Sequence, residues 1–109
     1  MSTDRDETEY FKEGNKLVVM LTKELDHHNA TLIKEQIDLF ILNGGIRNVV
    51  FDFEETTFMD SSGIGVILGR YRMLNPISGN VYVKNMNKEI QRIFLISGLH
   101  KLVEIEVDH

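Results

Sequence analysis

Apolar residues in the first half of the chain follow the pattern of strands. Tyr10 and Phe11 precede a turn at residues 13–15, and five apolar residues then run without a break from Leu17 to Leu21. Such a run is typical of a strand that is buried on both faces. Residues 48–53 form a second, largely apolar run of strand length. The pattern therefore predicts a short strand, a turn and two buried strands.

A helix is predicted between the two buried strands. Its apolar residues recur at the spacing of one helical face: Ala30, Ile33, Ile37, Phe40 and Ile41. Asp26 or Asn29 is suited to cap its start, and Gly44–Gly45 is suited to end it. A helix between two apolar strands favours a right-handed crossover and parallel pairing of those strands.

The second half of the chain repeats the alternation of helix and strand. A second helix is predicted from about Gly63 to Leu74, followed by a strand at 81–83. A third helix is predicted from Asn87 to Gly98, and the alternating residues 103–107 predict a final strand. We expect a single α/β domain, a mixed β-sheet with helices packed mainly on one face, whose strand order the pattern leaves open.

Composition narrows the function classes. The chain has 109 residues, enough for one domain, and we expect a flexible acidic N-terminus at 1–8 and the domain at 9–109. The lack of cysteine excludes disulfides, thiolate metal sites and a cysteine nucleophile. A net charge of −5 makes nucleic acid and anionic membranes poor partners. The polar start has no signal-peptide pattern, so we expect a cytoplasmic protein.

The junction Asp60-Ser61-Ser62-Gly63 is the main candidate for chemistry. It follows an apolar strand and opens a predicted helix. The first amides of a helix lack internal partners, and the helix dipole is positive at this end. A serine there can simply cap the helix, or the position can accommodate a phosphoryl group.

The second helix has an unusual face. Its predicted core face holds Ile64, Ile67, Leu68, Tyr71 and Leu74. The opposite face holds Gly65, Val66, Gly69 and Met73. Each glycine inside a helix costs about 1 kcal/mol relative to alanine. A smooth, partly apolar strip suits the close approach of another protein. The alternative is that the glycines let a neighbouring loop of the same chain pack tightly.

Three segments resemble one family. Residues 58–71, which read FMDSSGIGVILGRY, resemble the signature of anti-sigma factor antagonists of the STAS family (sulphate transporter and anti-sigma antagonist). Residues 24–28 and 96–99 resemble two further motifs of that family, in the right order. The segment Glu-Leu-Asp-His-His favours the sporulation branch. A general-stress antagonist with the same mechanism and a non-switching STAS interaction module are the alternatives.

The resemblance implies a partner-switching mechanism. The unphosphorylated antagonist binds a serine-kinase anti-sigma factor, which then releases its sigma factor. The kinase phosphorylates the serine after the motif's aspartate, here Ser61, and a PP2C-type phosphatase reverses this. The protein is then no enzyme, needs no cofactor and is a monomer when free. The expected partner-binding residues are Asp26, Asp60, Ser61, Ser62, Gly63, Gly65, Val66, Gly69 and Met73.

Two rival readings have weaker support. A serine hydrolase would need a base such as His27, His28 or His100, but Ser61 lacks the Gly-x-Ser-x-Gly elbow. A metal site would need ligands among Asp26, His27, His28, His100 and Asp108. These residues do not have the sequence spacing of a known metal-binding motif. Adjacent histidines are expected to point apart on a helix. Phosphate-binding glycine loops are absent from the sequence, so nucleotide binding is not indicated.

Overall fold

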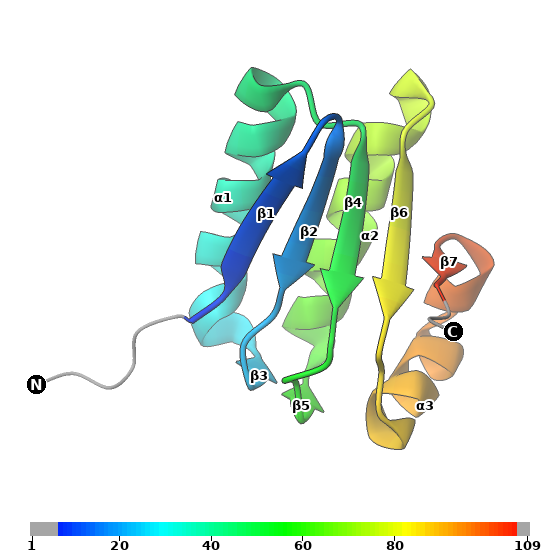
Figure 1. The fold of residues 1–109 in the computed structure, drawn as a ribbon. Coiled ribbons are helices and arrows are strands. Elements are labelled where there is room, and N and C mark those ends of the chain that lie inside the picture. Colours follow the sequence, from blue (N-terminus) through cyan, green and yellow to red (C-terminus); the bar gives the residue numbers. More distant parts are fainter. Residues whose placement is uncertain (1–6, 107–109) are drawn as a thin grey trace, which may run out of the picture.

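The computed structural model describes residues 7–106, which form two small sheets and three α-helices (Figure 1). In chain order the elements are β1 (Glu9–Glu13), β2 (Lys16–Met20), β3 (Glu24–Leu25), α1 (His27–Gly44), β4 (Asn48–Asp52), β5 (Phe58–Met59), α2 (Ser61–Leu74), a 3₁₀ turn (Asn75–Ile77), β6 (Asn80–Lys84), α3 (Lys88–Ser97), a 3₁₀ turn (Leu99–Lys101) and β7 (Glu104–Ile105). Every predicted helix and strand is present. The sequence pattern missed β3 and β5. Most of the predicted N-terminal segment 1–8, and Val107 of the predicted last strand, lie outside the described residues.

The larger sheet is mixed. Its strand order is β1-β2-β4-β6-β7, with β1 antiparallel to β2 and the other neighbours parallel. The predicted parallel pairing of the two buried strands, β2 and β4, is therefore confirmed. Helices α1 and α2 lie side by side behind this sheet, and α3 lies beside its β7 edge (Figure 1). The prediction of a mixed sheet with helices mainly on one face is confirmed.

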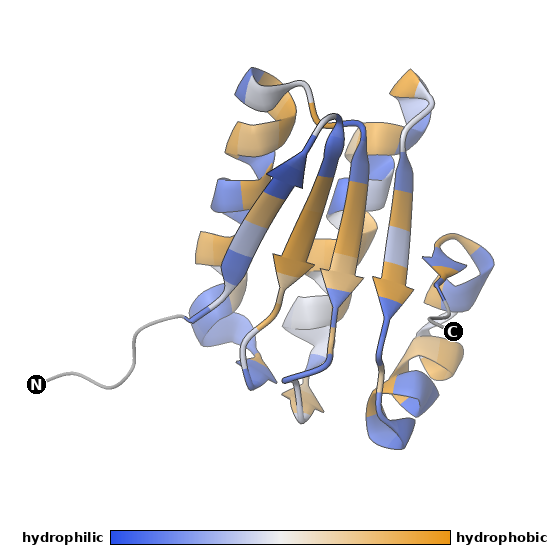
Figure 2. Ribbon diagram, viewed as in Figure 1, coloured by the Kyte–Doolittle hydropathy of each residue, from blue (hydrophilic) through white to orange (hydrophobic). Residues whose placement is uncertain are grey.

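The core lies between the sheet and helices α1 and α2. Leu17 and Val19 of β2 are fully buried there, together with Val49 and Phe51 of β4 and Ile33 of α1. Apolar colour runs along the middle of β2 and β4 in Figure 2, and β6 shows two apolar bands separated by a more polar one. The prediction that β2 is buried on both faces is wrong. Val18 and Met20 are only half-buried, because helices cover one face of this sheet.

Helix α1 has well-defined ends. Asp26 is the N-cap, and its side chain accepts a hydrogen bond from the amide of His28 at 3.0 Å. The side chain of Asn29 in turn accepts one from the amide of Asp26 at 3.1 Å, which completes a capping box. Gly45 ends the helix at φ 69°, a left-handed conformation that favours glycine. Both residues that the sequence suggested as caps therefore act together.

None of the helices within 7–106 has the length and apolar character needed to cross a membrane.

A buried ion pair joins α1 to α2. Arg70 is only 4% exposed, and its Nε lies 3.0 Å from Oδ1 of Asp38. Lys34 lies 3.5 Å from the other oxygen of the same carboxylate. Desolvation lowers the pKa of Arg70 from its usual value, and the charge of Asp38 counters this by raising it. Asp38 therefore compensates a charge that the packing of the two helices has removed from water.

We predict that Asp38→Asn destabilises the protein, because it leaves the buried guanidinium of Arg70 without its counter-charge. Breaking a fully buried pair costs about 3–5 kcal/mol, and the 20% exposure of the Asp38 side chain reduces the expected loss to about 2 kcal/mol. Urea unfolding would measure it. Glu35→Gln, on an exposed position of α1, is the matched control and should change stability by less than about 0.5 kcal/mol. Equal stability of the two variants would contradict the assigned role of the pair.

Candidate functional site

The starts of α1 and α2 are held next to each other by a two-stranded parallel sheet. Strands β3 and β5 pair through Glu24 with Phe58 and Leu25 with Met59. The amide of Asp60 also donates a hydrogen bond to the carbonyl of Leu25 at 3.2 Å. Each strand is followed at once by an aspartate that caps a helix. Two positive helix ends therefore lie at the same place on the surface.

Asp60, and not a serine, caps α2. Its backbone is extended, and its side chain accepts a hydrogen bond from the amide of Ser62 at 2.8 Å. Ser61 is the first helical residue and is exposed. Within residues 7–106, no hydrogen bond involves the Ser61 hydroxyl. The alternative that Ser61 or Ser62 serves as the N-cap is therefore wrong, and the Ser61 hydroxyl faces solvent without a structural task.

Gly63 is required by packing inside the protein. It is buried, and a Cβ atom at this position would lie 2.5 Å from Cγ of Met59 and 2.9 Å from Cγ of Leu25. No side chain fits there unless β3 or β5 moves. Gly63 therefore faces the small sheet and not the surface, whereas its expected role in partner binding stays a prediction. Its effect on the site is to bring the start of α2 against β3 and β5.

Gly65 and Gly69 have the opposite surroundings. A Cβ atom at either position would meet nothing within 4 Å, so no neighbouring loop uses the space. The alternative that these glycines allow tight packing within the chain is therefore wrong. They line a shallow groove of about 300 Å³ between α1 and α2, whose other lining residues are His27, Ala30, Thr31, Lys34, Ser62, Val66 and Arg70.

Two members of the predicted strip differ from expectation. Val66 is only 4% exposed and belongs to the core, so its placement on the outer face is wrong. Met73 is half-buried and does not line the groove. The physical reason is that α1 lies beside α2 and buries one flank of it, and the hydrophobic pattern of α2 does not reveal this neighbour. The same contact buries Arg70, a groove residue that the sequence analysis missed.

Among residues 7–106, the histidines near the site do not belong to a metal-binding cluster. The ring centroids of His27 and His28 lie 4.2 Å apart, so the expectation that these side chains point apart is wrong. Across the described part of the chain, no group of three or more histidine, aspartate or glutamate residues is arranged to hold a metal ion. Asp108 of the rival metal set lies outside the described residues. Asp26 is occupied as the cap of α1.

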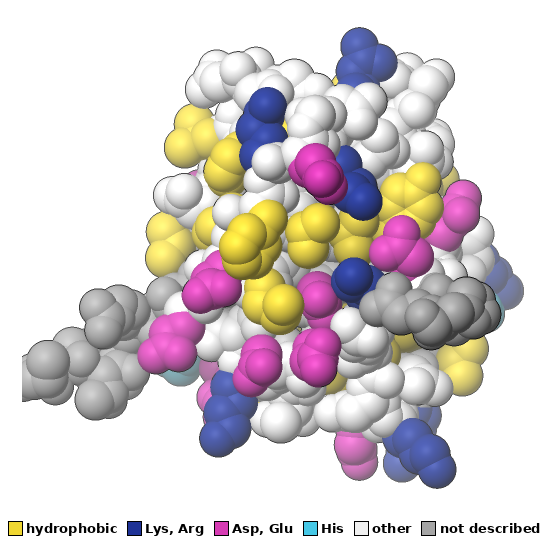
Figure 3. All heavy atoms as spheres, viewed as in Figure 1, with side chains coloured by type: hydrophobic (Ala, Val, Ile, Leu, Met, Phe, Trp, Pro, Cys, Tyr) yellow, Lys and Arg dark blue, Asp and Glu magenta, His cyan; other side chains and the backbone are white. Residues whose placement is uncertain are grey.

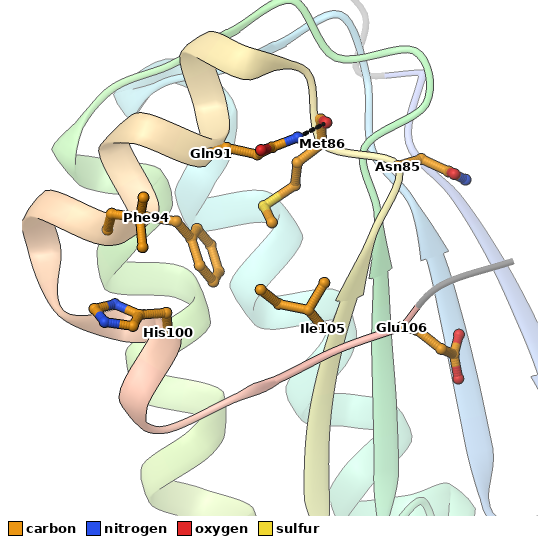
Figure 4. Close-up of a pocket in the computed structure, with 8 residues that line it drawn as sticks. Asn85, Met86, Gln91, Phe94, His100, Ile105 and Glu106 are labelled. Carbon is orange, nitrogen blue, oxygen red and sulfur yellow. Dashed lines mark hydrogen bonds between the residues drawn. The ribbon is translucent and has the colours of Figure 1, made fainter.

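His100 belongs to a different hollow, near α3. This cavity of about 390 Å³ is bounded by α3, the second 3₁₀ turn and β7. The side chains of Met86, Phe94 and Ile105 point toward one another there, and His100 lies at its side (Figure 4). Ser61 does not line this cavity. His100 and Ser61 therefore do not share this cavity.

Comparison with known proteins gives the family. Residues 8–109 match the STAS domain model. The anti-sigma F factor antagonist of Paenibacillus polymyxa is 39% identical over 89 residues, which are 82% of this chain and 76% of that protein. The anti-sigma factor antagonist SpoIIAA in its unphosphorylated form has a similar structure, with a TM-score of 0.78 at 27% identity over 94% of this chain and 89% of that one. The Bacillus cell fate determinant SpoIIAA in its phosphorylated form gives 0.76 at 30% identity over 93% and 92%.

The family match spans nearly the whole sequence, and the similar structures cover more than nine-tenths of this chain. Both agree with the motifs at 24–28, 58–71 and 96–99. This chain belongs to the STAS domain family, within which it groups with the anti-sigma factor antagonists.

Proposed function

We propose that this protein antagonises a serine-kinase anti-sigma factor and is switched by phosphorylation of Ser61. In this proposal the unphosphorylated form binds the kinase through the helix starts and the groove between α1 and α2, so that the kinase releases its sigma factor. Phosphorylation by the kinase ends this binding, and a PP2C-type phosphatase restores it. Similarity to the anti-sigma F factor antagonist of Paenibacillus polymyxa favours the sporulation branch.

One observation carries the proposal. Ser61 is exposed at the first turn of α2 while Asp60 caps that turn, so the Ser61 hydroxyl can accept a phosphoryl group without loss of a structural hydrogen bond. The similar protein whose structure is known in a phosphorylated form supports the same chemistry. Ser62 is a poorer substrate because it is half-buried.

A phosphate at Ser61 would change charge more than shape. It adds about −1.5 to −2 charges at neutral pH, directly beside the Asp60 carboxylate. The amides and dipole of α2 favour an anion at this end, so the fold tolerates the group. A kinase that presents its own ADP phosphates here would meet like charge at close range. Repulsion of this kind across an interface can cost several kcal/mol.

The groove supplies the remaining contact surface. Gly65 and Gly69 leave open space above α2, and Val66 forms an apolar floor. Lys34 borders the groove from α1. A partner side chain can therefore approach the backbone of α2 closely. The proposal makes the protein a binding module rather than an enzyme, and it assigns it to the cytoplasm, where sigma factors act.

We predict that the cognate kinase and ATP add one phosphate to the protein, on Ser61. Peptide mass spectrometry would locate it. Ser61→Ala should stay unmodified and Ser62→Ala should still be phosphorylated, because Ser61 is exposed whereas Ser62 is half-buried. Phosphate found mainly on Ser62, or on the Ser61→Ala variant, would refute the assignment.

A second prediction concerns the charge of the switch. Ser61→Asp should fold like the unmodified protein and bind the ADP-loaded kinase at least about tenfold more weakly, because it adds a negative charge beside Asp60. Isothermal titration calorimetry would measure the affinity. The uncharged Ser61→Asn variant is the matched control and should keep most of its affinity. If Ser61→Asp bound as tightly as Ser61→Asn, charge repulsion would not be the switch.

A third prediction concerns the groove. Gly69→Glu should weaken kinase binding by about tenfold, because its side chain fills open space on the proposed contact surface. Its stability should hold or rise slightly, since removing a helical glycine relieves up to about 1 kcal/mol. Leu39→Glu adds the same charge at an exposed position of α1 outside the groove and serves as the control. Equal binding by the two variants would exclude the groove from the interface.

A further inference from the structure

The face of the larger sheet that points away from α1 and α2 is apolar at its centre. Pairing across the sheet places Phe11, Val18, Val50 and Tyr82 in one row on this face. Their neighbours along each strand, such as Leu17 and Val19, belong to the core on the helix side. Figure 3 views this face and shows apolar side chains across its middle.

This row is unusual for the open side of a two-layer fold. An uncovered sheet face normally alternates to polar residues, whereas β2 and β4 are apolar on both faces, as in sheets covered on both sides. Phe11 is 52% exposed, and Val18, Met20 and Tyr82 are half-buried. Among residues 7–106, no helix covers the row. Val50 at the centre of the row is only 1% exposed, so the accessible apolar surface is that of Phe11, Val18, Met20 and Tyr82. A contiguous exposed apolar patch is typical of interaction surfaces.

An acidic cleft adjoins the apolar row. It has a volume of about 670 Å³ at the end of the sheet where β2 and β4 finish, and Met20 lines it next to the row. Four glutamates line the cleft against one lysine, namely Glu7, Glu9, Glu54 and Glu55 against Lys23. Glu104 ends the apolar row at the other side, opposite Tyr82. Figure 3 shows acidic side chains below and beside the patch, with one basic side chain among them and further basic side chains above the patch.

The charges discriminate between possible occupants. A second copy of the chain would bring the same glutamates against these, and like charges across an interface oppose association. Residues 1–6, outside the described structure, carry Asp4 and Asp6 against Arg5, so they add no favourable charge. A segment with lysine or arginine beside apolar side chains complements both parts of the surface.

We propose that this sheet face and its acidic cleft bind a cationic, apolar segment of a partner protein. Apolar side chains of the segment pack on Phe11, Val18 and Tyr82, and its basic side chains lie among Glu7, Glu9, Glu54 and Glu55. The surface is on the opposite side of the sheet from the groove between α1 and α2 (Figure 1). It is therefore a second binding surface, independent of the kinase contact proposed above.

The test uses a defined probe, a short synthetic peptide of alternating leucine and lysine, titrated into ¹⁵N-labelled protein. We expect saturable binding, with amide shifts concentrated in β1, β2 and β6. Phe11→Ser and the double variant Glu9→Lys/Glu55→Lys should each weaken binding by about tenfold or more. Glu35→Lys, an exposed charge reversal on α1, is the control and should change it less than about twofold.

Four results would overturn the proposal. These are the lack of saturable binding, shifts concentrated on α1 and α2, equal loss in the Glu35→Lys control, and equal binding of a leucine–glutamate peptide. Analytical ultracentrifugation of the protein alone adds a fifth, because self-association abolished by Phe11→Ser would assign the face to a second copy. Circular dichroism of each variant separates loss of binding from loss of fold.

Discussion

The candidate site depends on the parallel pairing of β3 with β5. These strands have only two residues each, yet they fix where both α1 and α2 begin. Gly63 makes the arrangement possible, because any side chain there would collide with Leu25 and Met59. The two helices then run side by side from a common start, and the ion pair between Asp38 and Arg70 joins them further along. As a result, the groove between α1 and α2 has a fixed base.

In the first turn of α2, the residue that caps the helix differs from the proposed modification site. Asp60 supplies the carboxylate that the helix start requires, and its hydrogen bond to the Ser62 amide satisfies one of the free donors. Ser61 is exposed and leaves this cap to Asp60, so the proposed modification would not break the cap. A phosphate there would enter a region already suited to negative charge. In this account the partner detects a change of charge on a surface of unchanged shape.

Much of the fold follows from local signals. Asp26, Asn87 and Gly98 define helix ends because caps and left-handed glycines leave clear marks in a sequence. Strands β3 and β5 were missed because two residues carry no detectable periodicity. For the same reason, the sequence pattern could not predict that α1 and α2 start next to each other.

The site was predicted less completely than the fold. The glycines at 65 and 69 were correctly read as leaving free space, since glycine inside a helix needs a reason. Val66 and Arg70 were misplaced or missed because their burial depends on α1, and a helical pattern does not report which helix lies beside it. The run from Leu17 to Leu21, which contributes Val18 to the apolar row, was predicted to be buried on both faces because its composition alone indicates this.

The central claim is that modification of Ser61 alters charge and leaves the shape of the protein unchanged. Comparison of ¹H–¹⁵N correlation spectra of the unmodified protein and the protein phosphorylated on Ser61 tests it directly. The account predicts that amide shift changes are confined to residues 60–65 and to the groove between α1 and α2. Changes spread through the strands of the larger sheet and α3 would contradict it, because a propagated conformational change would then carry the switch.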